Sequence, residues 1–351
     1  MGLGESDVEA RWIGIRRHQA VLLIVGVALM GEGIITSRVR LGAIVAGMFL
    51  LLCVAPTGDG RTVGEQTLIA LRFVLRQQWR TFNARELGED IVLWCGGEVA
   101  FRTYELVHHG RLDLSGRDAM IAHSLTEFAD AASAARTGQH FSVHVTRRRK
   151  GACTLLALPV DAPAPDGWTP TNALALELLL GSSEDRSFSL FERLTYVRNS
   201  RELVRVYRVR DFSFAPQRQS LLEPLLRSPE FFDVALHVDV VSGATAQRLA
   251  SRAVHRVGSD DETSRSAGFR RTARSSRIFE RMAQRERYVA GGRALLRVAV
   301  YVVVRADTLD ELQRRGALVW RHAHDAGLRL DRGRGLQAAW YRSQLPGGPG
   351  W

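Results

Sequence analysis

The chain has 351 residues, of which 46% are apolar. This composition excludes a disordered chain and suits about two domains. The formal net charge is +11 and is carried by arginine, since Lys150 is the single lysine. A basic surface favours an anionic partner: nucleic acid, acidic lipid or an acidic protein face. The three cysteines, Cys53, Cys95 and Cys153, lie far apart, which excludes a disulfide framework and a CxxC zinc site.

Two apolar runs follow a short tail, residues 1–18. They are QAVLLIVGVALMGEGII (19–35) and LGAIVAGMFLLLCVA (41–55), separated by five residues. Each approaches the roughly 17–25 residues of a spanning helix, so residues 19–55 are predicted to form a transmembrane helical hairpin. Arginines on the outer flanks predict an inner-membrane protein with both termini and the soluble part in the cytoplasm. The alternative is a buried helical pair in a soluble core.

Residues 56–90 are predicted to hold an amphipathic helix at the membrane interface. Leu68, Leu71, Leu75, Trp79 and Phe82 share one helical face, and arginines line its flank. The alternative is a helix packed on the soluble part. The residues expected at the membrane interface are Arg16, Arg17, Arg72, Arg76, Trp79 and Arg80.

Residues 91–225 are predicted to form a cytoplasmic α/β region. FSVHV (141–145) and TLLALPV (154–160) are typical of two strands joined by a basic turn, and ELVRVYRV (202–209) alternates apolar and charged residues as a half-exposed strand does.

Residues 226–346 are predicted to form a second α/β domain, followed by a tail, 347–351. FFDVALHVDV places Val234, Leu236, Val238 and Val240 on one face, and ALLRVAVYVVV (294–304) is typical of a buried strand. Between them lie segments with helical character. Thr308 and Glu311 form a capping box for a helix that ends at Gly327. Its expected buried stripe consists of Leu309, Leu312, Val319, Trp320 and Ala323. The predicted class is therefore α+β, with helices packed on a mixed sheet.

The sequence offers no recognisable catalytic motif. A phosphate-binding loop needs lysine followed by Ser or Thr after a glycine-rich turn, whereas Lys150 stands in VTRRRKGA. His322 and His324 are two positions apart on a predicted helix, where their side chains diverge. No catalytic residue, cofactor or metal is therefore expected, and no enzymatic activity.

The segment from Arg265 to Arg297 holds ten arginines. It is interpreted as a solvated helix face balanced by Glu280 and Glu286. Contact with nucleic acid or an acidic partner is the alternative.

Two parts of the chain resemble components of conjugative type IV secretion systems. The hairpin with RTVGEQTLIALRFVLRQQWRTF resembles the PrgI-type (VirB3-like) membrane component. The stretch from FFDVALHVDV through TLDEL to LQAAWYRSQLP resembles the N-terminal, non-ATPase domain of VirB4-type proteins. Their combination resembles the actinobacterial SCO6880-type fusion proteins, over about residues 10–85 and 225–347.

The resemblance implies a non-catalytic, membrane-anchored scaffold subunit that docks a separate VirB4-like ATPase and is oligomeric in the assembly. Its expected partners are membrane lipids, the ATPase and other secretion subunits. The residues it points to for docking are Arg285, Glu286, Trp340, Leu345 and Pro346. Trp340 and Leu345 are expected to pack on the domain. The alternatives are a type VII secretion membrane subunit and a membrane-tethered nucleic-acid-binding protein.

Overall fold

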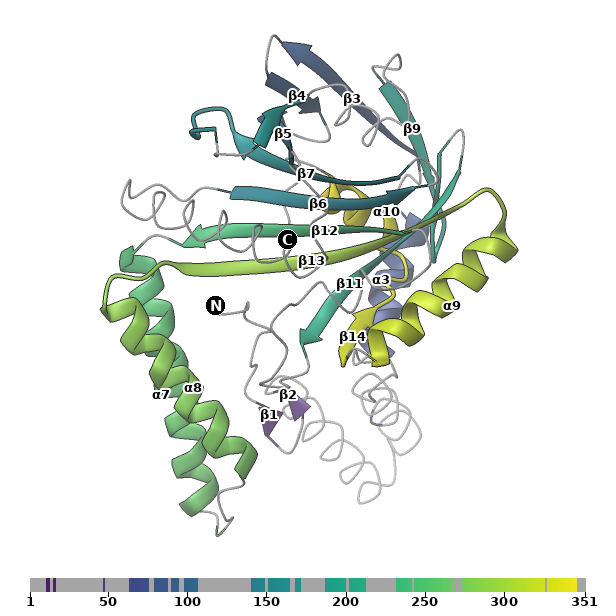
Figure 1. Ribbon diagram of the computed structural model, residues 1–351. Coiled ribbons are helices and arrows are strands. Elements are labelled where there is room, and N and C mark those ends of the chain that lie inside the picture. Colours follow the sequence, from purple (N-terminus) through teal and green to yellow (C-terminus); the bar gives the residue numbers. More distant parts are fainter. Residues whose placement is uncertain are drawn as a thin grey trace, which may run out of the picture. The chain divides into compact units, whose positions relative to one another are not determined.

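The structure is a computed structural model of the chain (Figure 1). The residues that it describes are 11–12, 15–16, 47, 63–75, 79–87, 90–94, 98–106, 140–148, 151–164, 168–171, 187–199, 202–212, 232–241, 243–266, 268, 273–325 and 327–345.

The chain divides into two compact units. The first comprises residues 1–4, 77–246 and 291–351, and the second comprises residues 5–76 and 247–290. The second unit holds a two-stranded pair, a first helix and most of a helical hairpin. Its elements are β1 (Arg11–Trp12), β2 (Ile15–Arg16), α3 (Val63–Leu75), α7 (Gly243–Ser266) and α8 (Ala273–Ala290).

The first unit is built on one twelve-stranded sheet in which every pairing is antiparallel. In chain order its strands are β3 (Trp79–Leu87), β4 (Asp90–Trp94), β5 (Glu98–Leu106), β6 (His140–Arg148), β7 (Gly151–Pro159), β8 (Trp168–Pro170), β9 (Ser187–Glu192), β10 (Val197–Arg198), β11 (Leu203–Phe212), β12 (Phe232–Val241), β13 (Leu295–Ala306) and β14 (Leu328–Asp331).

The pairing path of this sheet closes on itself. Its order is β10-β9-β3-β4-β5-β7-β6-β12-β13-β11-β14, with β8 beside β5, and β10 also pairs with β11. The short β10, at one end of the path, therefore closes it by pairing with β11, the strand before the other end. A closed path gives the sheet an inner face and an outer face.

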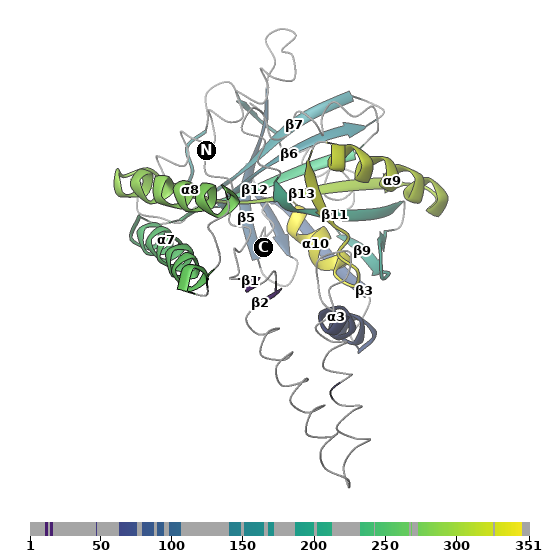
Figure 2. The ribbon, with the colours of Figure 1, turned by 90° about the horizontal axis from the view of Figure 1, so that it is seen from below.

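The two faces carry separate hydrophobic cores, because side chains alternate along each strand. On the outer face, Val300, Val302 and Val304 of β13 pack with helix α9 (Leu309–Asp325). On the inner face, Tyr301 and Val303 pack with helix α10 (Gln337–Gln344). Figure 2 shows α9 and α10 on opposite sides of β11 and β13.

Local signals in the sequence predict several of these elements correctly. Val234, Leu236, Val238 and Val240 share the outer core. The backbone N–H of Glu311 donates to Oγ1 of Thr308, 3.3 Å away, at the start of α9. Gly327 has a positive φ of 75° beyond the helix end. Of the predicted stripe on α9, Leu312, Val319 and Ala323 are buried, whereas Leu309 is 40% exposed.

The predicted class, an α+β protein with a mixed sheet, is wrong, because the described residues form an antiparallel and mostly-sheet structure. Helical segments between strands suggested crossovers within an α/β layer. Helices α7 and α8 instead connect β12 to β13, which are antiparallel neighbours. The helical pair is thus an insertion between two adjacent strands.

The expected membrane protein is also contradicted. None of the helices in the described part of the chain is long and apolar enough to cross a membrane. For the described residues, this finding contradicts the predicted membrane protein with its transmembrane hairpin and inner-membrane location. Residues 19–55, on which the hairpin was predicted, lie outside the described residues.

The predicted interfacial helix ends earlier than its apolar pattern indicated. Helix α3 stops at Leu75, and Trp79 and Phe82 belong to strand β3. Phe188 of β9 is the register partner of Phe82. Alternation with period two and repetition with period 3.6 overlap in a segment this short, so tertiary pairing decides between them.

Gly333 provides a test of the inner core. It has a φ of +55°, and a Cβ atom at this position would lie 2.3 Å from ring atoms of Trp340. We expect Gly333→Ala to lower the free energy of unfolding by about 2–4 kcal/mol, from left-handed strain and overpacking together. Urea denaturation of the full chain measures this. Gly243→Ala is the matched control, since its Cβ would meet nothing within 4 Å; equal losses in both variants would contradict the close contact.

Candidate functional site

Helix α10 lies on the inner face of the sheet and forms the centre of the candidate site. Trp340, Tyr341 and Leu345 are buried within the inner core. The ring of Trp340 meets that of Tyr301 edge-on, with 6.5 Å between the centroids. The prediction that Trp340 and Leu345 pack on this domain is confirmed.

The side-chain amide of Gln337 fixes α10 to strand β11. Its Oε1 accepts from the backbone N–H of Val206 at 2.9 Å, and its Nε2 donates to the carbonyl of Val206 at 3.0 Å. Along this edge β10 pairs only with Leu203 and Val204, and β14 begins its pairing at Arg208. Gln337 therefore supplies the hydrogen bonds of a strand in the interval between β10 and β14.

A buried carboxylate meets the first turn of α10. Glu192 is fully buried, and its Oε1 accepts from the backbone N–H of Ala338 at 2.9 Å. The first N–H groups of a helix lack partners within the helix and carry partial positive charge. A carboxylate at this end therefore accepts a hydrogen bond and is attracted by the charge. The next residue, Arg193, is exposed. Hairpin β9–β10 thus contributes to the protein surface and also, through Glu192, to the site on which α10 packs. We call this site, formed by Glu192 and Val206, the seat of α10.

Three charged residues form a second polar group on the inner face. Arg305 of β13 donates from Nε to Oδ2 of Asp233, 2.8 Å away, and from Nη1 to Glu202. Burial alone would lower the pKa of Arg305, but the carboxylates of Glu202 and Asp233 raise it well above its ordinary value. The guanidinium stays charged and connects β13 to β12 and to the residue that precedes β11.

Histidines from β6 and β12 form a third group. Nδ1 of His140 lies 2.5 Å from Oδ1 of Asp239, and its Nε2 lies 3.3 Å from Nδ1 of His237. Nε2 of His144 lies 2.9 Å from Oγ of Ser142.

The two inner histidines are held neutral. Burial, with a contribution from His140, lowers the pKa of His144 to about 3. Burial, His144 and His140 lower the pKa of His237 well below its ordinary value, while the backbone of Gln344 opposes this shift. Nε2 of His237 nevertheless makes no hydrogen bond of ordinary geometry. His144 and His237 are buried, whereas His140 and Asp239 are partly exposed, so the two inner histidines are suited to a structural role.

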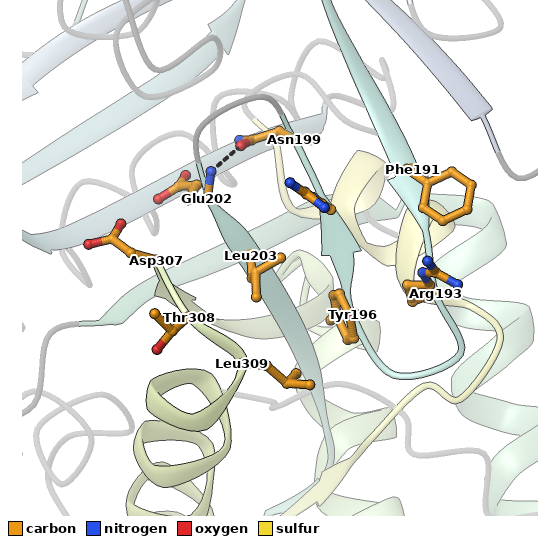
Figure 3. Close-up of a pocket in the computed structure, with 10 residues that line it drawn as sticks. Phe191, Arg193, Tyr196, Asn199, Glu202, Leu203, Asp307, Thr308 and Leu309 are labelled. Carbon is orange, nitrogen blue, oxygen red and sulfur yellow. Dashed lines mark hydrogen bonds between the residues drawn. The ribbon is translucent and has the colours of Figure 1, made fainter.

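A surface pocket of about 320 Å³ opens beside this seat, between hairpin β9–β10, the start of β11 and the N-terminus of α9 (Figure 3). Its apolar lining comes from Phe191, Tyr196, Leu203 and Leu309. Figure 3 shows Glu202 and Asp307 on one side and Arg193 on the other.

Short hydrogen-bonded turns shape the pocket. The N–H of Arg193 donates to the carbonyl of Tyr196 at 2.8 Å, which closes the tip of the hairpin. The N–H of Glu202 donates to Oδ1 of Asn199 at 2.6 Å, which shapes the entry to β11. The N–H of Gly335 donates to the carbonyl of Leu194 at 2.7 Å and connects the hairpin to the segment before α10. The pocket wall and the seat of α10 are therefore one connected structure.

The residues predicted to dock a partner fall into different parts of the protein. Trp340 and Leu345 belong to the first unit, whereas Arg285 and Glu286 lie on α8, in the second. Glu286 accepts from Oγ of Ser251 in α7 at 2.5 Å, and Nε of Arg285 is buried without a hydrogen-bond partner. Pro346 lies outside the described residues.

The residues predicted at a membrane interface form no common set either. Arg16 belongs to β2, Arg72 to α3, and Trp79 and Arg80 to β3. Arg17 and Arg76 lie outside the described residues.

The polar residues that hold α10 were missed in the sequence. A signal existed for the histidines, since His140, Ser142 and His144 alternate with the apolar Phe141, Val143 and Val145. Such alternation is normally attributed to a solvent-facing side. Nothing local marks Gln337 or Glu192, because their partners are 131 and 146 residues away along the chain. Within the described ranges, no group of three or more His, Cys, Asp and Glu side chains is arranged to hold a metal ion.

Comparison with protein-family models and with curated proteins gave no match to the chain.

Replacement of Gln337 tests the connection between α10 and β11. We expect Gln337→Leu to lower the free energy of unfolding by about 2–4 kcal/mol, because it leaves the N–H and carbonyl of Val206 buried and unpaired. Urea denaturation followed by tryptophan fluorescence measures the loss. Gln313→Leu, at an exposed position of α9, is the control, and a loss no larger than in this control would contradict the role of Gln337.

The buried histidines predict acid sensitivity. The unfolded chain takes up a proton on each near pH 6.5, whereas native His144 does so only near 3. The unfolded state thus binds more protons in between, and stability falls as the pH falls from about 6.5 toward 3, by about 1.4 kcal/mol per pH unit for each such histidine. Denaturation at a series of pH values should show this slope, and His144→Phe should reduce it. The exposed His324→Phe is the control; an unchanged slope in His144→Phe would refute the assignment.

Proposed function

We propose that the chain is a non-catalytic docking subunit of a conjugation-type secretion apparatus and that it binds a separate VirB4-type ATPase. The support is the resemblance over residues 225–347 together with the firm seat of the segment LQAAWYRSQLP. In the resembling proteins this segment leads from the docking domain to the motor. Here hydrogen bonds and burial fix it from Gln337 to Leu345.

The observation that carries the proposal is the connection between this seat and an exposed pocket. Hairpin β9–β10 places Glu192 against α10 and Arg193 at the pocket. Leu194 and Leu309 beside it are 44% and 40% exposed. A partner bound there would be held in a fixed geometry relative to α10, as a scaffold requires.

The arginines of α7 and α8 give the nucleic-acid alternative less support than the docking function has. Arg265 pairs with Asp261 at 3.2 Å on the same helix. Asp260, Glu262 and Glu280 add further negative charge to the two helices. Phosphate backbones are bound by uncompensated positive charge, which this pattern reduces.

Co-expression of the full chain with a VirB4-type ATPase tests the proposal. We expect a complex of defined mass in size-exclusion chromatography with light scattering. Leu309→Asp should weaken it at least about tenfold, because the substitution puts a charge on an apolar contact. Ala317→Asp, an exposed position farther along α9, is the matched control. Two proteins that elute separately at micromolar concentration would refute the proposal.

A further inference from the structure

The pocket beside α9 has two cationic side chains that form no ion pair with any described residue. Arg193 and Arg198 are both exposed and line it. Arg193 stacks on the ring of Phe191, with 4.6 Å from the guanidinium carbon to the centroid. Neither arginine forms an ion pair in the described part of the chain. Stacking keeps the guanidinium of Arg193 in place while its N–H groups stay available.

The carboxylates and the arginines of the pocket lining lie on different sides of the pocket. Glu202 pairs with Arg305, which it shares with Asp233, and Asp307 is the exposed carboxylate of the lining. Both arginines come from hairpin β9–β10, whereas the two carboxylates come from the start of β11 and the turn before α9, so an anionic group is favoured on the side of the hairpin.

The remaining lining is apolar and aromatic. Tyr196, Leu203 and Leu309 form a surface on which an aliphatic or aromatic side chain can lie. Tyrosine and arginine are, with tryptophan, the residue types enriched among those that contribute most at protein interfaces. A volume of about 320 Å³ lies at the small end of ligand sites, roughly 300–1,000 Å³, which suits one or two side chains of a peptide.

The acidic residues nearby disfavour a phosphate ester as the ligand. Asp310 occupies the first turn of α9, next to Asp307 in the pocket, whereas Glu311 pairs with Arg315. A group with close to two negative charges would be repelled more strongly by these carboxylates than a single carboxylate would.

We propose that this pocket binds an extended peptide segment of a partner protein that places an apolar side chain on Tyr196 and Leu203 and a carboxylate beside Arg193 and Arg198. The inference rests on the proposed docking function and gives the chemistry of the segment that docks. The apolar side chain supplies contact area, and the carboxylate sets the direction of the peptide.

A random peptide display library selected on the full chain tests this chemistry without the ATPase. The double variant Arg193→Glu/Arg198→Glu serves for counter-selection, and Arg321→Glu, exposed on α9, is the matched control. We expect the selected peptides to carry Asp or Glu next to a large apolar residue. They should bind the wild type and Arg321→Glu equally, and the double variant at least about tenfold more weakly. Circular dichroism verifies that the double variant is folded.

The outcomes separate the two proposals. Three outcomes would each overturn the peptide assignment. The selected peptides could lack an acidic residue, no peptide could prefer the wild type to the double variant, or binding could be unaffected by the charge reversal. An ATPase complex that forms normally with the double variant would also overturn it and leave the docking function intact. Acidic–apolar peptides combined with the absence of an ATPase complex would refute the docking function and support the pocket.

Discussion

The amide of Gln337 holds the inner half of this protein together. Strand β11 meets β13 along one edge, but its other edge is shared between β10 and β14, which leave the peptide groups of Val206 between them. Buried peptide groups without partners destabilise a fold by about 1–3 kcal/mol each. Gln337 pairs with both groups of Val206 and donates further to the carbonyl of Arg332 at 2.7 Å. Its helix must therefore lie against β11, and Trp340 and Tyr341 are thereby directed into the core.

The polar groups of the inner face act chiefly on register. A slip of β12 by one residue would move Asp233 and His237 to the face of α9, away from Arg305 and His140. Replacement of buried ions by apolar residues is often neutral for stability, so specification of one pairing is the better account of the three charged residues. The neutral histidines lie elsewhere on the same inner face, and their burial lowers the stability of the fold in acid.

Hairpin β9–β10 links the interior to the surface. Glu192 is the last residue of β9 and is buried, whereas Arg193 begins the turn that follows and is exposed. The first receives the N-terminus of α10 and the second borders the pocket. A segment bound in the pocket would contact the same hairpin that positions α10. This arrangement gives a physical basis for a subunit that holds a partner in one orientation.

The sequence by itself determined the local elements of the first unit. Alternation in FFDVALHVDV, the capping pair Thr308 and Glu311 and the glycine at 327 depend on neighbours within a few residues, so strands β12 and β13 and helix α9 were predictable. The burial of Trp340 and Leu345 also followed from the sequence. Only the tertiary structure decided that all the strands are antiparallel, that α7 and α8 are an insertion and that Trp79 belongs to a strand. It also brought Gln337 to Val206 and His237 to His140, across 131 and 97 residues. Such partners are set by strand order and sheet closure, which no local pattern encodes, because hydrogen-bonding groups are chemically alike until the chain path places two of them together.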